Sequence, residues 1–263
     1  MAEGSGPQKT WLVVGASRGI GKAFVDQLLA KGNRVIATVR GQASEYWPDQ
    51  KDRCTVLNCD VAVEKTINFF VEQLSTIPDL KKIDYVVINA GILVYPNRAT
   101  GESFDGFTRH LTTNTVGPII CAQRLLKSGI PIGTIVFMSS DSGSQQAFRH
   151  MEDGFAAYAA SKTALNMAAR HMDAELKRKG TKTSILCLHP GEVETDMTRI
   201  DINWEVEAEV LTPEQSAKQS IEAIESKRYE DSGTFFTYDN RVSRSSTTAS
   251  LATLADMIKV QPW

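Results

Sequence analysis

The sequence of 263 residues lacks the features that direct a protein to a membrane or a nucleic acid. Its longest apolar runs, such as residues 11–14 and 85–88, are far too short to span a bilayer. The formal net charge is only −2, so there is no basic excess to attract nucleic acid or an anionic membrane surface. We therefore expect a small-molecule ligand and no nucleic-acid or membrane partner.

Signals for export, anchoring or metal binding are equally scarce. Residues 1–9 are polar and lack the apolar segment of a signal peptide, and we expect them to be flexible. Residues 260–263 match no lipidation or retention signal. The few cysteines lack CxxC spacing; they are Cys54, Cys59, Cys121 and Cys187. Buried free thiols in a reducing compartment are the simplest interpretation, so we expect a cytoplasmic location and no metal site.

Short apolar segments alternate with amphipathic ones, without an internal repeat. Strands are expected at 10–14, 34–39, 55–59, 85–89, 134–138, 184–188 and 234–237. Helices are expected at 19–31, 63–74, 107–127, 156–179 and 213–226. Strands that are nearly all Val, Ile and Leu indicate a parallel sheet covered on both faces. We therefore predict a single α/β domain over residues 1–263, a doubly wound Rossmann-type sheet of about seven strands, with ligands beyond the carboxyl ends of the strands.

A glycine-rich loop follows the first expected strand and opens the first helix. Such a loop presents free backbone N–H groups and the positive helix end to a phosphate. Its spacing is GxxxGxG, and on its own it is also compatible with simple packing. The strand-loop-helix context favours a cofactor phosphate, and the candidate residues are Gly15, Ser17, Arg18, Gly19, Ile20 and Gly21.

The end of the second expected strand favours NADPH over NADH as the cofactor. An acid at this position accepts the ribose 2′-hydroxyl, whereas an arginine favours a 2′-phosphate. The sequence has Arg40 there and no acid before Glu45, and Arg18 adds a second cation. Each arginine is also compatible with a solvated surface charge, but the two together predict NADPH/NADP+.

Tyr158 and Lys162 stand four residues apart in an expected helix, so they lie on one face. A phenol has a pKa of about 10 and is a poor acid or base at neutral pH. A nearby cation favours the phenolate and would bring the tyrosine toward the range where it exchanges a proton. Alone, such a pair is usually a surface contact, and its weight comes from the surrounding motifs.

Seven motifs in order carry a resemblance over nearly the whole chain. They are residues 14–21, 59–61, 89–91, 114–117, 138–140, 158–162 and 190–197. With these motifs the chain resembles the short-chain dehydrogenase/reductase family. The stretches 141–144, 164–167 and 189–191 look most like the C-factor and sniffer-type carbonyl reductase branch, and fungal secondary-metabolism reductases look similar there.

The resemblance implies a catalytic set of four residues. Tyr158 would protonate the carbonyl oxygen, and Lys162 would hold the nicotinamide ribose and lower the pKa of Tyr158. Ser140 would hydrogen-bond the substrate oxygen; it is preferred to its neighbour Ser139 because Gly143 completes the family's Ser-x-x-Gly pattern. Asn114 would bind the water that links Lys162 to solvent.

The resemblance also implies further cofactor contacts after the later strands. They are Asp60 and Val61 at the adenine, Asn89, Ala90 and Gly91 at the ribose, and Pro190, Val193 and Thr195 at the nicotinamide. The protein would supply position and a proton, and the cofactor would supply the hydride.

Three departures from the family pattern concern the loop and the substrate side. Val14 stands where the family often has Thr, and we expect cofactor binding to survive this change. The stretch 144–155 is longer than usual and is either a substrate-shaping rim or a tolerated surface insertion. Glu192 stands where the sniffer-type branch often has Trp, so it either selects a basic or hydroxylated substrate or faces water.

Three histidines show no partner arrangement and are expected to be structural: His110, His171 and His189.

The predicted function is NADPH-dependent reduction of a ketone or aldehyde. The alternatives are an alcohol dehydrogenase acting in the oxidative direction and a cofactor-binding signalling protein of C-factor type. The complete catalytic set argues against a pure binding protein, and the two arginines argue for reduction because cellular NADP is kept mostly reduced. The substrate itself is not encoded in a motif; we expect residues 92–101, 144–155 and 198–210 to shape its site, the last as a mobile lid.

The helices expected at 107–127 and 156–179 usually build a dimer contact in this family. The second helix carries small and apolar residues at i, i+4 spacing: Ala160, Ala164, Ala168 and Met172. Such a stripe lets another helix approach closely, although it could instead pack only on the sheet. We expect a symmetric homodimer, which the stretch 144–155 and the polar tail 241–250 could block.

Overall fold

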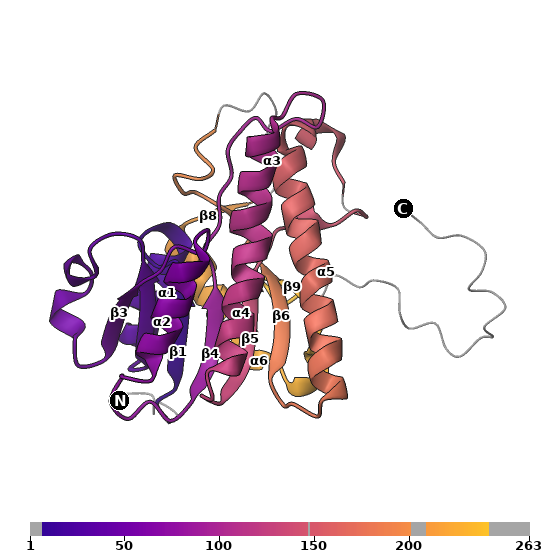
Figure 1. Ribbon diagram of the computed structural model, residues 1–263. Coiled ribbons are helices and arrows are strands. Elements are labelled where there is room, and N and C mark those ends of the chain that lie inside the picture. Colours follow the sequence, from indigo (N-terminus) through magenta and orange to yellow (C-terminus); the bar gives the residue numbers. More distant parts are fainter. Residues whose placement is uncertain (1–6, 147, 201–208, 242–263) are drawn as a thin grey trace.

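The computed structural model describes residues 7–146, 148–200 and 209–241, which form a parallel sheet covered by helices (Figure 1). The strand order is β3-β2-β1-β4-β5-β6-β9, and every pairing is parallel. The strands are β1 (Thr10–Val14), β2 (Arg34–Val39), β3 (Cys54–Asn58), β4 (Ile83–Ile88), β5 (Ile132–Met138), β6 (Ser184–His189) and β9 (Phe235–Thr237). The predicted doubly wound α/β sheet is therefore confirmed, with strand ends shifted by one or two residues.

Helices cover both faces of this sheet. They are α1 (Gly19–Ala30), α2 (Glu64–Leu74), α3 (Phe104–Leu111), α4 (Gly117–Lys127), α5 (Ala156–Arg178) and α6 (Pro213–Ser226). Apolar side chains of α2, α4 and α5 form one core cluster with the sheet, and those of α1 and α6 form another on the opposite face. In Figure 1, α4 and α5 lie side by side across the first of these faces.

Strand β1 illustrates why the strands are nearly continuous apolar runs. Leu12 and Val14 belong to the core cluster beneath α2, α4 and α5, whereas Trp11 and Val13 belong to the cluster beneath α1 and α6. All four side chains are fully buried. Burying each such side chain stabilises the fold by about 1.5–3 kcal/mol, so both faces of the strand must be apolar.

The helix expected over residues 107–127 is present, but it begins at Phe104 and its α-helical pattern is interrupted. The structure has α3, then a π-helical turn over Thr112–Val116, then α4. Pro118 has no N–H to donate to the carbonyl of Asn114, so the α-helical hydrogen bond is lost at this point. Gly117 faces the backbone of Val61 so closely that a Cβ would lie 2.0 Å from its carbonyl oxygen. The adjacent Gly117 and Pro118 are the sequence signal for this break.

Several smaller elements were not expected from the sequence. A second, two-stranded parallel sheet pairs β7 (Glu192–Val193) with β8 (Val210–Leu211). The segment between β2 and β3 contains two short 3-10 turns, Ala43–Glu45 and Pro48–Gln50. Most of the expected lid at 198–210, residues 201–208, lies outside the described residues, as do residues 1–6 and 242–263 of the expected flexible ends.

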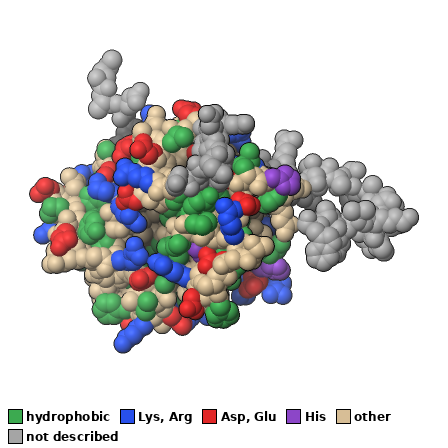
Figure 2. Space-filling view, turned by 90° about the horizontal axis from the view of Figure 1, so that it is seen from above, with side chains coloured by type: hydrophobic (Ala, Val, Ile, Leu, Met, Phe, Trp, Pro, Cys, Tyr) green, Lys and Arg blue, Asp and Glu red, His purple; other side chains and the backbone are tan. Residues whose placement is uncertain are grey.

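The cysteine interpretation and the membrane expectation can be compared with the structure. All four cysteines are buried and free, as the interpretation of unpaired buried thiols requires. Within the described ranges, no helix combines the length and the apolar character that a membrane crossing needs. Figure 2 shows acidic and basic side chains interspersed over the described part of one face, without an extended area of one sign.

Candidate active site

A cleft lies where the loops after β1, β2, β3, β4, β5 and β6 meet. Of the residues expected at the cofactor, those that line it are Gly15, Ser17, Arg18, Gly19, Ile20, Arg40, Asp60, Val61, Asn89, Ala90, Gly91, Tyr158, Lys162, Pro190 and Thr195. Gly21, Val193, Asn114 and Ser140 do not line it but lie beside or behind it. Ile92, from the stretch 92–101 expected at the substrate, also lines it. The lining residues not among those expected at the cofactor or substrate are Val39, Cys59, Thr113, Met138, Ser139, Asp196 and Met197.

The glycine loop is packed against the end of β4. Gly15 has a φ of +88°, and a Cβ there would lie 2.8 Å from Ala90. A Cβ on Gly21 would lie 2.1 Å from the carbonyl oxygen of Gly15, which accepts a 2.7 Å hydrogen bond from Asn89 Nδ2. Gly21 therefore supports the loop, while the loop leaves backbone N–H groups at the start of α1 for an anion.

The two arginines at the cleft have different surroundings. Arg40 is exposed and makes no hydrogen bond or ion pair with the residues that the structure describes. Arg18 instead pairs with Asp196 at 2.7 Å between Nη1 and Oδ2, across the mouth of the cleft. The residues present fit a nicotinamide dinucleotide: a glycine loop at a helix start, an unpaired cation at the end of β2, and Gly91, where a Cβ would crowd Asn114 at 3.2 Å.

Tyr158 and Lys162 lie together at the inner end of the cleft. The Lys162 Nζ atom lies 5.7 Å from the centroid of the Tyr158 ring and donates to the carbonyl oxygen of Met138 at 2.8 Å. Ser140 hydrogen-bonds the Tyr158 side chain. The backbone N–H of Tyr158 donates to Asn97 Oδ1 at 3.0 Å, which ties the start of α5 to the loop after β4.

Burial dominates the protonation of this pair. It lowers the pKa of Lys162 from 10.5 to about 8 and raises the pKa of Tyr158 from 10.0 to about 12. The hydrogen bond from Ser140 works in the opposite direction on Tyr158, while the carboxylates of Asp141, Glu192 and Glu152 add to the rise. The expected lowering of the Tyr158 pKa by Lys162 is therefore corrected for this structure, in which Tyr158 holds its proton firmly at neutral pH.

Asn114 is held rigidly in the π-helical turn. Its Oδ1 accepts from the Ile92 N–H at 2.8 Å, and its Nδ2 donates to the Ile92 carbonyl at 2.9 Å and to Ser161 Oγ at 3.0 Å. The side chain is fully buried. These contacts join α4, α5 and the loop after β4, so Asn114 serves first to fix the floor of the cleft.

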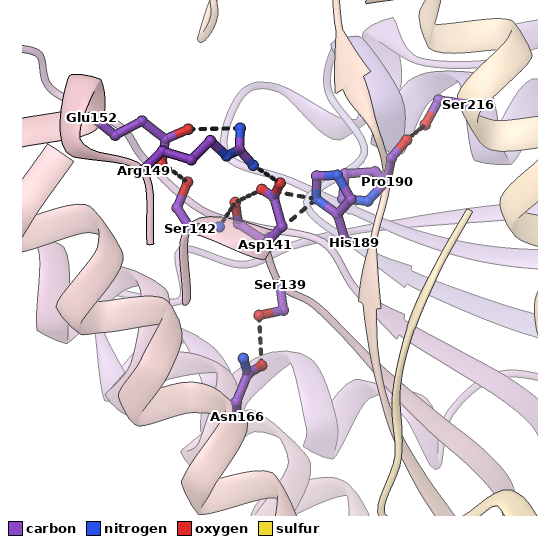
Figure 3. Close-up of polar contacts among 10 residues, drawn as sticks. Ser139, Asp141, Ser142, Arg149, Glu152, Asn166, His189, Pro190 and Ser216 are labelled. Atoms are coloured by element: carbon purple, nitrogen blue, oxygen red, sulfur yellow. Dashed lines mark hydrogen bonds and ion pairs between the residues drawn. The ribbon is translucent and has the colours of Figure 1, made fainter. Parts of the chain in front are cut away.

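A charged cluster that the sequence did not reveal lies around Asp141, the residue after Ser140. We use this name for Asp141, Arg149, Glu152, His189 and Glu192, of which Figure 3 shows the first four. The Arg149 guanidinium contacts the Asp141 carboxylate and reaches Glu152 Oε1 at 2.8 Å. The Nδ1 atom of His189 accepts from the Asp141 N–H at 3.3 Å and lies 3.6 Å from Asp141 Oδ1. The sequence signal for this cluster is that Arg149, the only arginine in the stretch 144–155, stands close to the acidic residues Glu152 and Asp153.

The expectation that His189 has no partner arrangement is therefore wrong. Burial lowers its pKa, and the neighbouring Asp141 carboxylate works against that change. His110 does have a structural role, because its Nε2 accepts from the Val94 N–H at 3.1 Å and its Nδ1 lies 2.8 Å from the Gly106 carbonyl. His171 is exposed on α5.

The stretch 144–155 packs against the loop after β4. It ends in a 3-10 turn over His150–Phe155 that runs directly into α5. The rings of Tyr95 and Phe155 are 5.1 Å apart, and the Asn97 N–H donates to the Gly154 carbonyl at 2.8 Å. Together with Arg149, these contacts make the stretch a wall beside Tyr158 and not a loose surface insertion.

Three members of the charged cluster lie close enough to suggest a cation site. Ligand atoms of Asp141, His189 and Glu192 all lie within 4.8 Å of one another. However, the Arg149 guanidinium lies on the Asp141 carboxylate, and a backbone N–H donates to His189 Nδ1. Two of the three donors thus have partners already, so the cluster is better described as an ion-pair network.

Known proteins share both the sequence pattern and the architecture. A sequence model of the family described as short chain dehydrogenase matches residues 9–205. The chain belongs to this family. It is 29% identical over 247 residues to an uncharacterized oxidoreductase of Saccharomyces cerevisiae, covering 88% of this chain and 95% of that protein. It is also 29% identical over 231 residues to a 1-hydroxy-2-glutathionyl-2-methyl-3-butene dehydrogenase of a Rhodococcus species, covering 86% and 95%.

The fold of this chain is similar to that of solved carbonyl reductases. An NADPH-bound carbonyl reductase from chicken fatty liver matches with a TM-score of 0.78 and 26% identity, covering 89% of this chain and 98% of that one. The carbonyl reductase Sniffer of D. melanogaster matches with a TM-score of 0.74 and 25% identity, with the same coverage. The resemblance to sniffer-type and fungal enzymes is thus confirmed, and the chain is an oxidoreductase of the short-chain dehydrogenase family.

The buried Lys162 leads to a prediction about stability. Because its folded pKa of about 8 lies below the unfolded value of 10.5, folding disfavours the charged form. The full cost is present below pH 8 and disappears as the pH rises toward 10.5. Replacing Lys162 by Met should therefore raise the free energy of unfolding at pH 7 by about 1–3 kcal/mol, at about 1.4 kcal/mol per pKa unit, less the lost bond to Met138.

Thermal and urea unfolding at pH 7 and pH 10 would measure this effect. The advantage of Lys162→Met should shrink at pH 10. Lys22→Met, at an exposed position with an ion pair to Asp26, is the control and should change stability by about 0.5 kcal/mol or less. A clear destabilisation by Lys162→Met at pH 7 would contradict the assignment of a costly buried ammonium.

Proposed function

We propose that the protein reduces a ketone or an aldehyde to an alcohol with NADPH, and that Tyr158 is the general acid. The observation that carries this proposal is the hydrogen-bonded pair of Tyr158 and Ser140 beside Lys162, at the inner end of a cleft suited to a dinucleotide. When bound, the nicotinamide cofactor supplies the hydride. The protein supplies orientation and the proton.

Each catalytic residue has a defined task in this proposal. Tyr158 donates its phenolic proton to the carbonyl oxygen, and Ser140 donates a hydrogen bond to the same oxygen. Lys162 holds the nicotinamide ribose, and Asn114 fixes the floor beneath it and holds a water that returns a proton toward Lys162. Val193 and Thr195 hold the nicotinamide amide. Asp60, Val61, Asn89, Ala90, Gly91 and Pro190 hold the remainder of the cofactor.

The protonation of Tyr158 supports reduction as the preferred direction. A tyrosine whose pKa is raised to about 12 holds a proton to donate, whereas oxidation of an alcohol needs the phenolate as a base. Oxidation remains the second candidate because the Rhodococcus relative is named a dehydrogenase. Initial rates measured in both directions at one pH would distinguish the two.

The first functional prediction concerns the proton donor. Tyr158→Phe should lower carbonyl reduction by at least about 100-fold, because general acid catalysis contributes about 10²–10⁴-fold, while NADPH binding changes little. Rates with a panel of ketones, aldehydes and quinones, together with NADPH titration, would measure this. Tyr229→Phe removes a remote hydroxyl that donates to the Thr181 carbonyl and should retain full activity. Turnover by Tyr158→Phe near the wild-type rate would refute the role of Tyr158.

Arg40 supports the proposal of NADPH as the cofactor. Its guanidinium is unpaired among the described residues and lies at the end of β2, where the adenosine ribose is held in this family. A charge-assisted hydrogen bond to the 2′-phosphate is worth about 1.5–3 kcal/mol. Arg18 is paired with Asp196 and would have to break this ion pair to bind the phosphate. We therefore propose that Arg40 contributes more than Arg18 to the affinity for NADPH.

The second functional prediction follows from this difference. Arg40→Asp should shift the ratio of NADPH to NADH affinity toward NADH by about 100-fold or more, because it adds repulsion and removes attraction. Arg40→Gln removes only the attraction and should give an intermediate ratio of affinities. Titration calorimetry with both cofactors would measure the ratio. Equal binding of NADH and NADPH by the wild-type protein would overturn the preference.

We also propose a homodimer built on α4 and α5. On α5 the residues that face the sheet, Leu165, Ala169 and Leu176, are buried, whereas Ala160, Ala164, Ala168 and Met172 remain exposed or half-buried. Met167 is 55% exposed on the same helix. The stripe is therefore wider than the core needs, which favours a second buried face against a symmetry-related helix.

Sedimentation velocity at micromolar concentration would test the dimer. The wild-type protein should sediment at twice the chain mass of 28.9 kDa, and Ala168→Arg should sediment as a monomer. Ala30→Arg places the same side chain at an exposed position on α1, on the opposite face of the sheet, and should leave the dimer intact. A single wild-type species of monomer mass at every concentration would exclude this assembly.

A cytoplasmic location fits the four buried free cysteines and the use of NADPH. Fluorescence microscopy of the tagged chain would test it, and an organellar pattern would contradict it.

A further inference from the structure

Glu192 is the one member of the charged cluster whose carboxyl group has no direct partner among the described residues. The Asp141 carboxylate forms an ion pair with Arg149 and accepts a hydrogen bond from the Ser140 hydroxyl at 3.3 Å. Glu152 receives Arg149 at 2.8 Å and the Ser142 hydroxyl at 3.4 Å. Glu192 is half-buried, and its carboxyl group makes no hydrogen bond or ion pair with the part of the chain that the structure describes. A half-buried carboxyl group without a protein partner is left for water or for a ligand to satisfy.

The backbone that carries Glu192 is held in place. Gly191 has a φ of +88°, and a Cβ there would lie 2.8 Å from the Tyr238 ring, so the turn after Pro190 is packed tightly. Glu192 then pairs with Val210 in the β7–β8 sheet. Pro190 lines the cofactor cleft immediately before this turn. A carboxyl group carried on such a backbone is oriented before a ligand arrives, which reduces the cost of binding.

The environment of Glu192 is short of positive charge. The cluster holds three carboxyl groups and one guanidinium, that of Arg149, which pairs directly with Asp141 and Glu152. Burial lowers the pKa of His189. Burial raises the pKa of Glu192 and the neighbouring Asp141 carboxylate raises it further, while the charge of Arg149 works in the opposite direction. A positively charged or hydrogen-bond-donating group beside Glu192 would relieve both effects, whereas an anion would add a fourth like charge.

The cluster lies next to the reacting position. Asp141 directly follows Ser140, whose hydroxyl bonds both Asp141 and Tyr158. The field of Asp141, Glu192 and Glu152 reaches the Tyr158 phenol. A substrate whose carbonyl oxygen contacts Tyr158 and Ser140 would therefore extend the neighbouring part of its chain along the cluster.

We infer that Glu192 determines substrate specificity by accepting a hydrogen bond from an ammonium or hydroxyl group a few bonds from the reacting carbonyl. This inference rests on the proposed carbonyl reduction. The substrate class is an amino- or hydroxy-substituted ketone or aldehyde, and carbonyl compounds that carry a carboxylate or phosphate at that position are rejected.

Four matched methyl ketones test the inference with the full chain and NADPH. They carry a methyl, hydroxyl, ammonium or carboxylate group two carbons from the carbonyl. The wild-type protein should show the highest kcat/KM for the ammonium ketone, by about tenfold or more over the methyl ketone, and the lowest for the carboxylate. The hydroxyl ketone should lie between the ammonium and methyl ketones, which separates hydrogen bonding from net charge.

Two variants and one control isolate Glu192. Glu192→Gln should remove most of the preference for the ammonium ketone while kcat/KM for the methyl ketone changes by about threefold or less. Glu192→Lys should instead favour the carboxylate ketone, so the inference stays testable if one variant folds poorly. Glu194→Gln changes an exposed glutamate two residues away and should behave as wild type.

The outcomes separate this inference from the proposed function. If wild-type protein reduces the methyl ketone but ranks the ammonium and carboxylate ketones equally, the inference fails and carbonyl reduction stands. The inference also fails if both Glu192 variants keep the wild-type ranking. If the wild-type protein reduces none of the four ketones, carbonyl reduction of this class is refuted, and the inference falls with it.

Discussion

The parallel alignment of the central strands is the constraint on which the rest of the structure depends. Because β1, β4, β5 and β6 all run the same way, their carboxyl ends meet at one edge of the sheet. Backbone pairing continues one step past the strands: Ala90 donates to the Val14 carbonyl at 2.9 Å, and Ser139 donates to the Leu188 carbonyl at 2.7 Å. The polar loops therefore begin in register, and residues distant in sequence meet in one cleft.

Burial controls the chemistry inside that cleft. Lys162 carries its ammonium into a site with one backbone carbonyl as its recorded hydrogen-bond acceptor, and Tyr158 is surrounded by carboxylates and apolar atoms. Both groups are consequently shifted toward their neutral forms. Burying this amine lowers the stability of the fold, and it lies at the position where we propose that a ribose hydroxyl of the cofactor contacts it. Stability and function thus make opposite demands on Lys162.

The proposed cofactor side and the proposed substrate side of the cleft differ in how closely they follow the sequence pattern of the family. The glycine loop, Asn89 and the Tyr158–Lys162 pair follow the short-chain dehydrogenase pattern closely. The proposed substrate side consists of residues 144–155 and the turn that carries Glu192, where the chain departs from that pattern. Arg149 in the first segment pairs with Asp141, whose Oδ1 lies 3.6 Å from the Nδ1 of His189 just before the turn, so the charged cluster connects the two segments.

The sequence by itself determined the sheet, the glycine loop and the identity of the candidate catalytic residues, because strand-helix periodicity and local spacing are properties of neighbouring residues. It did not predict the π-helical turn that contains Asn114, although Gly117 and Pro118 are a sequence signal for it, because the apolar pattern of residues 107–127 indicated one regular α-helix. Only the tertiary structure decided that Arg149 and His189 meet at Asp141 and that the Glu192 carboxyl group has no hydrogen bond or ion pair with the described residues. These contacts join residues eight to about fifty positions apart, and ion pairing and burial over that span depend on how loops pack, which no local pattern encodes.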